Sequence, residues 1–349
     1  MGTTQQSGPT GRQETTMANP TMQAIVQGEY GEAGRVLRPA QIDRPVPADG
    51  QVLVRVAAAG VDMGAWHLIT GLPYPIRLAG YGFRRPKNPV PGREVAGRVE
   101  AVGAGVTELK AGDEVFGIGE GCFAQYVVAD AGKLAARPVQ LPPAQAASLP
   151  ISGLTALQAV RDRAEVRAGQ SVLVIGASGG VGSYAVQVAK AYGAEVTGVC
   201  RTAKLDLVRA LGADHVIDYT REDIVGDRRY DVIIDTGGNR RLRHLRRALS
   251  PTGTLVIVGG ETDGRWLGGA DRLLRALVVS RFSGRQNVRL MMASENGADL
   301  AVLAGMVERG EVTPAVDRTF PLDRTAEAIQ YLKDGKARGK VVVDLTAAG

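Results

Sequence analysis

The stretch Ser171-Val172-Leu173-Val174-Ile175-Gly176-Ala177-Ser178-Gly179-Gly180-Val181-Gly182 decides the fold of this chain. Residues 171–175 are a nearly continuous apolar run, which is typical of a strand buried on both faces. The glycines that follow allow a tight turn and a close approach of the backbone to a phosphate at a helix N-terminus. Ser178 departs from the usual G-x-G-x-x-G spacing. The setting between a strand and a helix nevertheless favours dinucleotide binding over a purely structural turn.

The chain beyond this turn continues as strands alternating with helices. An apolar stripe at helical spacing ends at Gly193, and it consists of Val181, Tyr184, Ala185, Val188, Ala189 and Tyr192. A second helix is predicted over 204–211. Further strands are predicted at 195–200, 215–217, 231–235 and 254–258, with 276–279 a candidate sixth strand. This alternation indicates a parallel, doubly wound sheet.

The N-terminal part has a different pattern. Val52, Val54 and Val56 share one face at period two, and glycines repeatedly separate short apolar runs between residues 92 and 121. Such a pattern predicts a small β-barrel or sandwich. Residues 72–91 contain five prolines and are predicted to form a long surface loop.

These patterns predict two domains and an extension. Residues 1–21 are polar and are expected to be a disordered N-terminal extension. Residues 22–149 form the β-rich domain, and residues 150–283 form the dinucleotide-binding domain. Residues 284–349, with two helices and a terminal strand, are expected to return to the first domain.

Composition and charge restrict the kinds of partner that we expect the protein to bind. The net charge is +6, but the basic residues are spread along the chain, apart from a cluster over 240–247. No binding motif accompanies that cluster, so a solvated helix face is favoured over a nucleic-acid patch. The apolar runs are too short to cross a bilayer, and the N-terminus lacks the apolar core of a secretory signal. The prediction is a cytoplasmic protein with a small-molecule substrate, no nucleic-acid partner and no membrane partner.

The end of the predicted second strand bears on which dinucleotide binds. NAD sites usually place an acidic residue there, whereas a 2′-phosphate requires positive charge. This chain has Cys200-Arg201-Thr202-Ala203-Lys204 and no acid. The alternative is that Arg201 and Lys204 are surface residues of a helix N-terminal turn, where the helix dipole disfavours cations. NADPH is therefore the predicted cofactor.

Metal and nucleophile chemistry have little support in the sequence. The three histidines and two cysteines never cluster, and no C-x-x-C or H-x-x-x-H pattern exists, which argues against a structural zinc. A catalytic zinc held by distant residues leaves no spacing signal, so that alternative stays open at this point. A serine nucleophile is not supported either, because no G-x-S-x-G elbow is present.

Several motifs in order resemble the medium-chain dehydrogenase/reductase superfamily. They are residues 89–103 (PVPGREVAGRVEAVG), 112–117 (GDEVFG), 154–156 (LTA) and 176–182. The resemblance runs from about residue 22 to residue 345, and it is to the zinc-free quinone-oxidoreductase-like branch in particular. It implies an α/β protein with a GroES-like catalytic domain, a Rossmann domain, a cofactor in the cleft and a homodimer.

The resemblance also bears on metal ligands. Zinc-dependent relatives hold their catalytic metal at positions that match Asp62, Arg93 and Ile151 here, a set that cannot complete a zinc site. The four-cysteine structural lobe of those relatives is absent as well. The predicted enzyme therefore holds no metal.

Residue-by-residue transfer completes the predicted cofactor site. Lys204 and Tyr219 match positions that contact the 2′-phosphate, Thr155 matches a residue beside the nicotinamide, and Gly339-Lys340 matches a C-terminal motif near the cofactor. The predicted cofactor-binding residues are Thr155, Gly176, Ser178, Gly179, Gly180, Val181, Arg201, Thr202, Lys204, Tyr219, Gly259 and Lys340.

The catalytic residues are less well defined by the pattern. Relatives often carry Asn-x-x-Asp where this chain has Asp62-Met63-Gly64-Ala65, and a tyrosine in place of His67. Asp62 and His67 are the candidate catalytic residues, with His67 a conceivable proton donor. The alternative for His67 is a structural hydrogen bond in a partly buried place. Trp66, Tyr74 and Tyr81 are predicted to line the substrate pocket.

The predicted reaction is hydride transfer from NADPH to a quinone or to the β-carbon of an activated alkene, followed by protonation. One alternative is an alcohol or aldehyde oxidoreductase of the same superfamily. The other is a cofactor-binding protein that keeps the fold without turnover.

Overall fold

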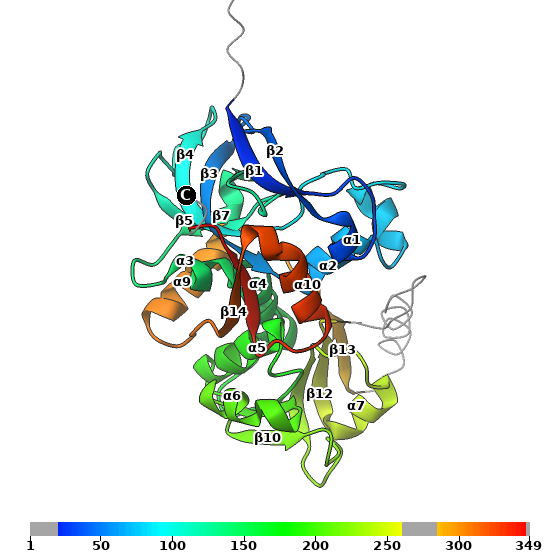
Figure 1. The fold of residues 1–349 in the computed structure, drawn as a ribbon. Coiled ribbons are helices and arrows are strands. Elements are labelled where there is room, and N and C mark those ends of the chain that lie inside the picture. Colours follow the sequence, from blue (N-terminus) through cyan, green and yellow to red (C-terminus); the bar gives the residue numbers. More distant parts are fainter. Residues whose placement is uncertain (1–19, 260–284, 347–349) are drawn as a thin grey trace, which may run out of the picture.

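A computed structural model describes residues 20–259 and 285–346, and two sheets dominate it (Figure 1). The first has six strands in the order β10-β9-β8-β11-β12-β13, and every neighbouring pair is parallel. The order reverses direction at β8, as in a doubly wound fold. The strands are β8 (Ser171–Ile175), β9 (Glu195–Cys200), β10 (His215–Asp218), β11 (Tyr230–Asp235), β12 (Leu249–Ile257) and β13 (Asn287–Leu290).

Helices cover both faces of the sheet at β8, which explains why its residues 172–175 are all apolar. Val172 and Val174 join the core cluster that packs beneath α5 (Gly180–Ala191), while Leu173 and Ile175 join a second cluster with α7 (Leu242–Ala248). Successive side chains of a strand point to opposite faces, so a sheet covered by helices on both sides needs both sets apolar.

The second sheet has seven strands. Its order is β14-β15-β3-β4-β5-β7, and β6 pairs with β3 beside this path. The C-terminal strand β15 pairs antiparallel with β3, so the end of the chain lies within the sheet built by the N-terminal half. The strands are β3 (Gln51–Val61), β4 (Glu94–Val102), β5 (Glu114–Ile118), β6 (Tyr126–Asp130), β7 (Leu134–Ala136), β14 (Val316–Pro321) and β15 (Lys340–Asp344).

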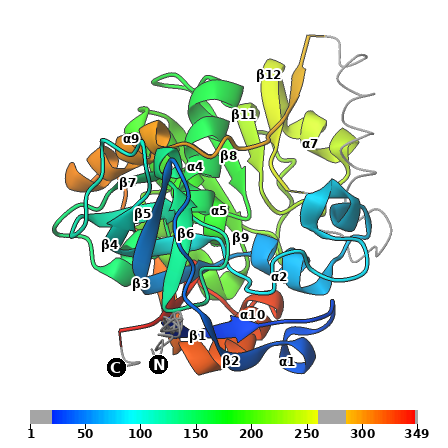
Figure 2. The ribbon, with the colours of Figure 1, turned by 90° about the horizontal axis from the view of Figure 1, so that it is seen from above.

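Short strands and helices complete the fold around both sheets (Figure 1 and Figure 2). A two-stranded ribbon of β1 (Thr21–Val26) and β2 (Arg38–Asp43) precedes the seven-stranded sheet. The helices are α1 (Ala33–Val36), α2 (Met63–Thr70), α3 (Pro143–Ala147), α4 (Pro150–Gln158), α6 (Leu205–Ala210), α9 (Gly297–Glu308) and α10 (Thr325–Lys333). Apolar residues of α4, α5 and α9 share one core cluster, which joins the two parts of the molecule.

The structure differs from the sequence prediction at two boundaries. β13 pairs with β12, so the parallel sheet continues to residue 290, past the predicted boundary at 283. The candidate strand 276–279 lies outside the described residues. The predicted extension 1–21 lies outside them up to residue 19, and β1 already begins at Thr21.

One other feature follows the predicted pattern. In α7, Leu245 and Ala248 are buried while Arg243 and Arg247 are exposed, which is the pattern of a solvated helix face. Among the described residues, no helix combines the length and the apolar character needed to cross a membrane.

Candidate functional site

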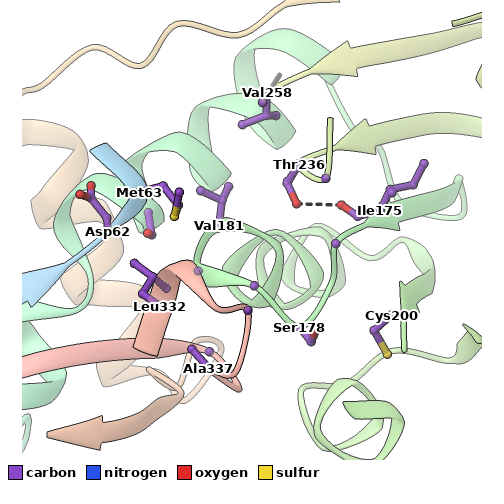
Figure 3. Close-up of a pocket in the computed structure, with 18 of the residues that line it drawn as sticks. Asp62, Met63, Ile175, Ser178, Val181, Cys200, Thr236, Val258, Leu332 and Ala337 are labelled. Atoms are coloured by element: carbon purple, nitrogen blue, oxygen red, sulfur yellow. Dashed lines mark hydrogen bonds between the residues drawn. The ribbon is translucent and has the colours of Figure 1, made fainter. Parts of the chain in front are cut away.

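A cleft of about 850 Å³ runs along the carboxyl ends of the parallel strands (Figure 3). Figure 3 shows that residues from several elements face it: Asp62 and Met63 at the start of α2, Ser178 and Val181 at the glycine turn, Cys200 at the end of β9, and Leu332 and Ala337 near the C-terminus. Parallel α/β sheets bind ligands at this edge. Of the predicted site residues, the structure brings to the cleft Asp62, Thr155, Gly176, Ser178, Gly179, Gly180, Val181, Arg201, Lys204, Tyr219, Gly259 and Lys340.

Two glycines make the turn after β8 compact. Gly176 adopts φ +80°, and a Cβ there would lie 2.6 Å from the Thr236 hydroxyl, which donates a hydrogen bond to the Ile175 carbonyl (Figure 3). A Cβ on Gly182 would lie 2.0 Å from the carbonyl oxygen of Gly176. Larger side chains are therefore excluded where the turn folds back on the helix.

The N-terminus of α5 opens onto the cleft. Gly179 is its N-cap residue, and no described side chain caps it. The first backbone N–H groups of a helix have no intrahelical partner and carry partial positive charge. Gly179, Gly180 and Val181 all line the cleft, so these donors are available to a phosphate group. The residues present therefore fit the pyrophosphate of a dinucleotide.

Positive side chains line the cleft beyond β9. Arg201 and Lys204 both face it, together with the half-exposed ring of Tyr219. Lys204 Nζ donates to the carbonyls of Gly335 at 3.1 Å and Ala337 at 2.5 Å. Burial lowers the pKa of the Lys204 ammonium, and the nearby Arg201 charge lowers it further.

Thr202 is a correction to the predicted site. It is not among the described residues that line the cleft, and its hydroxyl donates to the buried carboxylate of Asp218. Asp218 lies on β10, opposite Cys200 of β9. Hydrogen bonds from Thr202 and Thr220 lower the pKa of Asp218. Sequence reasoning missed this acid because it lies on the neighbouring strand, and strand pairing was the only signal that could have placed it there.

A buried ion pair joins the start of β4 to the start of β15 beside the cleft. Lys340 Nζ lies 2.5 Å from Glu94 Oε2 and 3.1 Å from Ser152 Oγ. The other carboxylate oxygen, Glu94 Oε1, accepts a hydrogen bond from Ile151 N at 2.9 Å. Glu94 therefore satisfies an N–H group in the first turn of α4, a helix with no described capping side chain. Burial raises the pKa of Glu94 to about 7 against the opposing effect of Lys340.

The α2 and α4 ends of the cleft are held by local hydrogen bonds. Asp62 is the N-cap of α2, and its Oδ1 accepts from Ala65 N at 2.8 Å. Thr155 donates from Oγ1 to the carbonyl of Ile151 at 2.7 Å. Asp62 is thus a capping residue that also faces the cleft.

The other predicted catalytic and substrate residues are not among the described residues that line the cleft; they are His67, Trp66, Tyr74 and Tyr81. The Nδ1 atom of His67 lies 2.7 Å from the carbonyl oxygen of Leu72, and its ring meets Trp66 edge to face. Trp66 stacks beneath the Lys333 ammonium, and Tyr74 lies near the Arg77 guanidinium. Tyr81 lines a second cavity, beside Arg93. Trp66 and His67 lie on α2, and Tyr74 and Tyr81 lie in the long 72–91 loop, which gives no periodicity from which side-chain orientation follows.

The positions matched to zinc ligands carry a different chemistry. Asp62 and Ile151 line the cleft, whereas Arg93 Nη2 is paired with both carboxylate oxygens of Glu295, at 2.7 and 2.9 Å. Burial alone would lower the pKa of the Arg93 guanidinium, but the Glu295 carboxylate outweighs it and raises the pKa. Among the described residues, no group of three or more His, Cys, Asp or Glu side chains is arranged to hold a metal ion.

The cleft is lined by residues of the parallel-sheet part and of the β-rich part of the chain, and the comparisons with known proteins give the class of protein. The family model described as alcohol dehydrogenase GroES-like domain matches residues 48–139, and the one described as zinc-binding dehydrogenase matches residues 211–343. The chain belongs to the medium-chain dehydrogenase/reductase superfamily, in its zinc-free quinone-oxidoreductase-like branch.

Individual relatives agree with this assignment. A chloroplast envelope quinone oxidoreductase homolog of Arabidopsis thaliana is 30% identical over 343 residues, covering 94% of this chain and 100% of the relative. An NADPH-dependent alkenal/one oxidoreductase of the same plant is 34% identical, over 92% of this chain and 79% of the relative. The solved quinone oxidoreductase of Coxiella burnetii is 28% identical with a TM-score of 0.79, covering 93% of this chain and 100% of that one. The chain is therefore an oxidoreductase of this family.

Proposed function

We propose that the protein reduces quinones or α,β-unsaturated carbonyl compounds with NADPH and without zinc. The observation that carries the proposal is one cleft, in which the N-terminus of α5, which no described side chain caps, the cations Arg201 and Lys204, and Thr155 all face the same space. A dinucleotide laid along it would have its pyrophosphate at α5 and its adenosine beyond β9.

The positive charge of the cleft beyond β9 supports a preference for NADPH over NADH. Arg201 and Lys204 supply positive charge where a 2′-phosphate would lie, and Tyr219 offers a ring and a hydroxyl. The nearby acid, Asp218, already accepts hydrogen bonds from Thr202 and Thr220, so it is not disposed to accept from ribose hydroxyls. One relative is itself named an NADPH-dependent oxidoreductase.

The side chains at the positions matched to zinc ligands support zinc independence. Arg93 stands at a position matched to a zinc ligand, and a guanidinium donates hydrogen bonds but has no lone pair for a metal. A metal-free site suits conjugated acceptors, whose extended π-system needs less polarisation than a simple ketone. The relatives named for quinone and alkenal/one substrates agree with that class.

Each part of the chain has a defined task in this reaction. A bound NADPH would supply the hydride, while the protein supplies binding, orientation and electrostatics. The N–H groups at the start of α5 hold the pyrophosphate, and Arg201 and Lys204 hold the 2′-phosphate. The buried Glu94–Lys340 pair keeps α4, with Thr155, in register with the start of β15. Such fixed geometry is what brings the reacting carbons within range.

The first experiment follows nicotinamide absorbance with chelator-treated protein, NADPH or NADH, and a panel of quinones, enones, enals and simple ketones. The expected result is NADPH-dependent loss with the conjugated acceptors, unaffected by chelation. Activity that disappears on chelation and returns with zinc would overturn zinc independence. Tight NADPH binding without turnover on any acceptor would establish a cofactor-binding protein instead.

A further inference from the structure

A second cavity, of about 510 Å³, lies beside the proline-rich loop. Its walls are mostly apolar, with a few polar groups that converge on it. The lining residues that matter here are Gln27, Leu68, Tyr81, Val90, Arg93 and Glu120. Gln27 is 4% exposed, and its Oε1 has no hydrogen-bond partner in the described part of the chain. A buried acceptor of this kind indicates a missing donor, which a ligand or a water in the cavity would supply.

Arg93 lines this cavity and is not among the described residues that line the cleft. It directly precedes Glu94, whose carboxylate contacts Ile151 and Lys340 at the cleft. The charges that act on its guanidinium include Tyr81 of the second cavity and Asp62 of the cleft. Arg93 is therefore a cation of the second cavity that directly precedes, in the chain, a residue whose carboxylate contacts the cleft.

The hydrogen bonds of Arg93 leave part of its guanidinium available. Only Nη2 contacts Glu295, and among the described residues Nε and Nη1 have no hydrogen-bond partner. Glu295 also pairs with Lys133, at 3.3 Å, so its charge remains compensated when Arg93 engages another oxygen. The Arg93 side chain is 20% exposed and lines the second cavity, so a ligand there can reach it.

We propose that Arg93 is a catalytic residue that binds the carbonyl oxygen of the acceptor, and that the acceptor is a conjugated carbonyl compound with an apolar body seated in this second cavity. The inference deepens the proposed reductase function and rests on it. An arginine suits the task because its planar guanidinium stays charged and offers several donors to one oxygen.

The movement of electrons in the reaction shows which substrate atom the positive charge of Arg93 stabilises. A hydride brings two electrons to the β-carbon, and the C=C π pair moves so that negative charge gathers on the carbonyl oxygen as an enolate. Arg93 stabilises that oxygen through its N–H groups, and a proton from solvent then adds to the α-carbon. The products are the saturated carbonyl compound and NADP⁺. A donor aimed at the developing oxyanion stabilises the transition state more than the ground state.

The test compares wild type with Arg93→Gln and Arg93→Lys on 2-cyclohexen-1-one and 1,4-naphthoquinone. We expect Arg93→Gln to lower kcat about 10²-fold or more on the enone, as loss of an oxyanion donor does. Arg93→Lys, which keeps the charge, should retain more activity. NADPH affinity, measured by fluorescence titration, should be unchanged in both variants.

A binding measurement tests the same contact without turnover. 4-Nitrophenolate carries its negative charge on an oxygen attached to a conjugated ring, and its absorbance reports binding. Wild type should bind it and Arg93→Gln should bind it at least tenfold more weakly. Arg137→Gln is the matched control, because it removes a half-buried arginine paired with Glu114 and should lower stability without changing phenolate binding.

The possible results distinguish the role of Arg93 from the reductase function on which it rests. If Arg93→Gln keeps wild-type kcat and phenolate affinity, the role of Arg93 is overturned while the reductase function stands. If wild type consumes no NADPH with any acceptor, the reductase function fails, and phenolate binding still decides whether Arg93 forms an oxyanion site.

Discussion

The ammonium of Lys340 lies 2.5 Å from the carboxylate of Glu94, although 246 positions separate the two residues. Both side chains are almost fully buried, and they connect the first residue of β15 with the first residue of β4. A buried charge is tolerated only when it is paired and hydrogen-bonded. This pair therefore connects the start of β15 to the start of β4 beside the cleft.

Removing one partner of this pair should be costly. Lys340→Met leaves the Glu94 carboxylate buried without its cation, and we expect a loss of about 3–5 kcal/mol in unfolding free energy. The double variant Lys340→Met with Glu94→Leu should recover much of that loss, because it leaves no buried charge. Urea denaturation measures all three proteins, and a double variant no more stable than Lys340→Met would contradict the account.

Lys204 should distinguish the two nicotinamide cofactors. Lys204→Gln removes a cation from the proposed phosphate site, and a charge-assisted hydrogen bond contributes about 1.5–3 kcal/mol, so NADPH affinity should fall roughly tenfold or more. NADH affinity should be unchanged. Lys190→Gln is the control, since Lys190 pairs with Asp214 and is not among the described residues of the cleft. Equal losses for both cofactors would refute phosphate recognition.

The same lysine predicts a pH dependence. Because burial and Arg201 lower the pKa of Lys204, its ammonium loses its proton at a lower pH than an ordinary lysine. The charge that holds the 2′-phosphate is thus present at neutral pH and is lost as the pH rises through the lowered pKa. The NADPH-to-NADH affinity ratio should fall in alkaline buffer in wild type, and titrations at several pH values check it. The ratio in Lys204→Gln should vary much less.

The turn after β8 should not tolerate a methyl group at Gly182. A Cβ there would lie 2.0 Å from the carbonyl of Gly176, so Gly182→Ala must displace the turn, at about 1–3 kcal/mol of stability. Cofactor binding should weaken as well, because the donors of α5 move with it. Gly132→Ala, where a Cβ meets nothing within 4 Å, should match wild type in melting temperature and in NADPH titration.

His67 should be dispensable for chemistry. Its Nδ1 contacts the Leu72 carbonyl, and it is not among the described residues of the cleft. We expect His67→Gln to change kcat by far less than the roughly 10²-fold that loss of a general acid costs. Steady-state kinetics on the best acceptor measures this, and a loss of that size accompanied by a shifted pH profile would restore His67 as the proton donor.

The sequence by itself determined the local elements and, through them, the fold. The apolar run of β8, the glycine turn and the stripe of α5 are encoded within 22 consecutive residues, from Ser171 to Tyr192, so periodicity and turn chemistry suffice to predict them. The approximate position of the cofactor cleft followed from this, as did the presence of Arg201 and Lys204 in it.

Only the tertiary structure decided which distant side chains meet. The pairing of β10 with β9 sets Asp218 beside Thr202, and the return of β15 to β3 sets Lys340 against Glu94. The same topology leaves His67 outside the described lining of the cleft and puts Arg93 in the lining of a second cavity. Local periodicity reports which face of an element is buried, whereas these contacts depend on strand order and on the path of long loops, which no local pattern encodes.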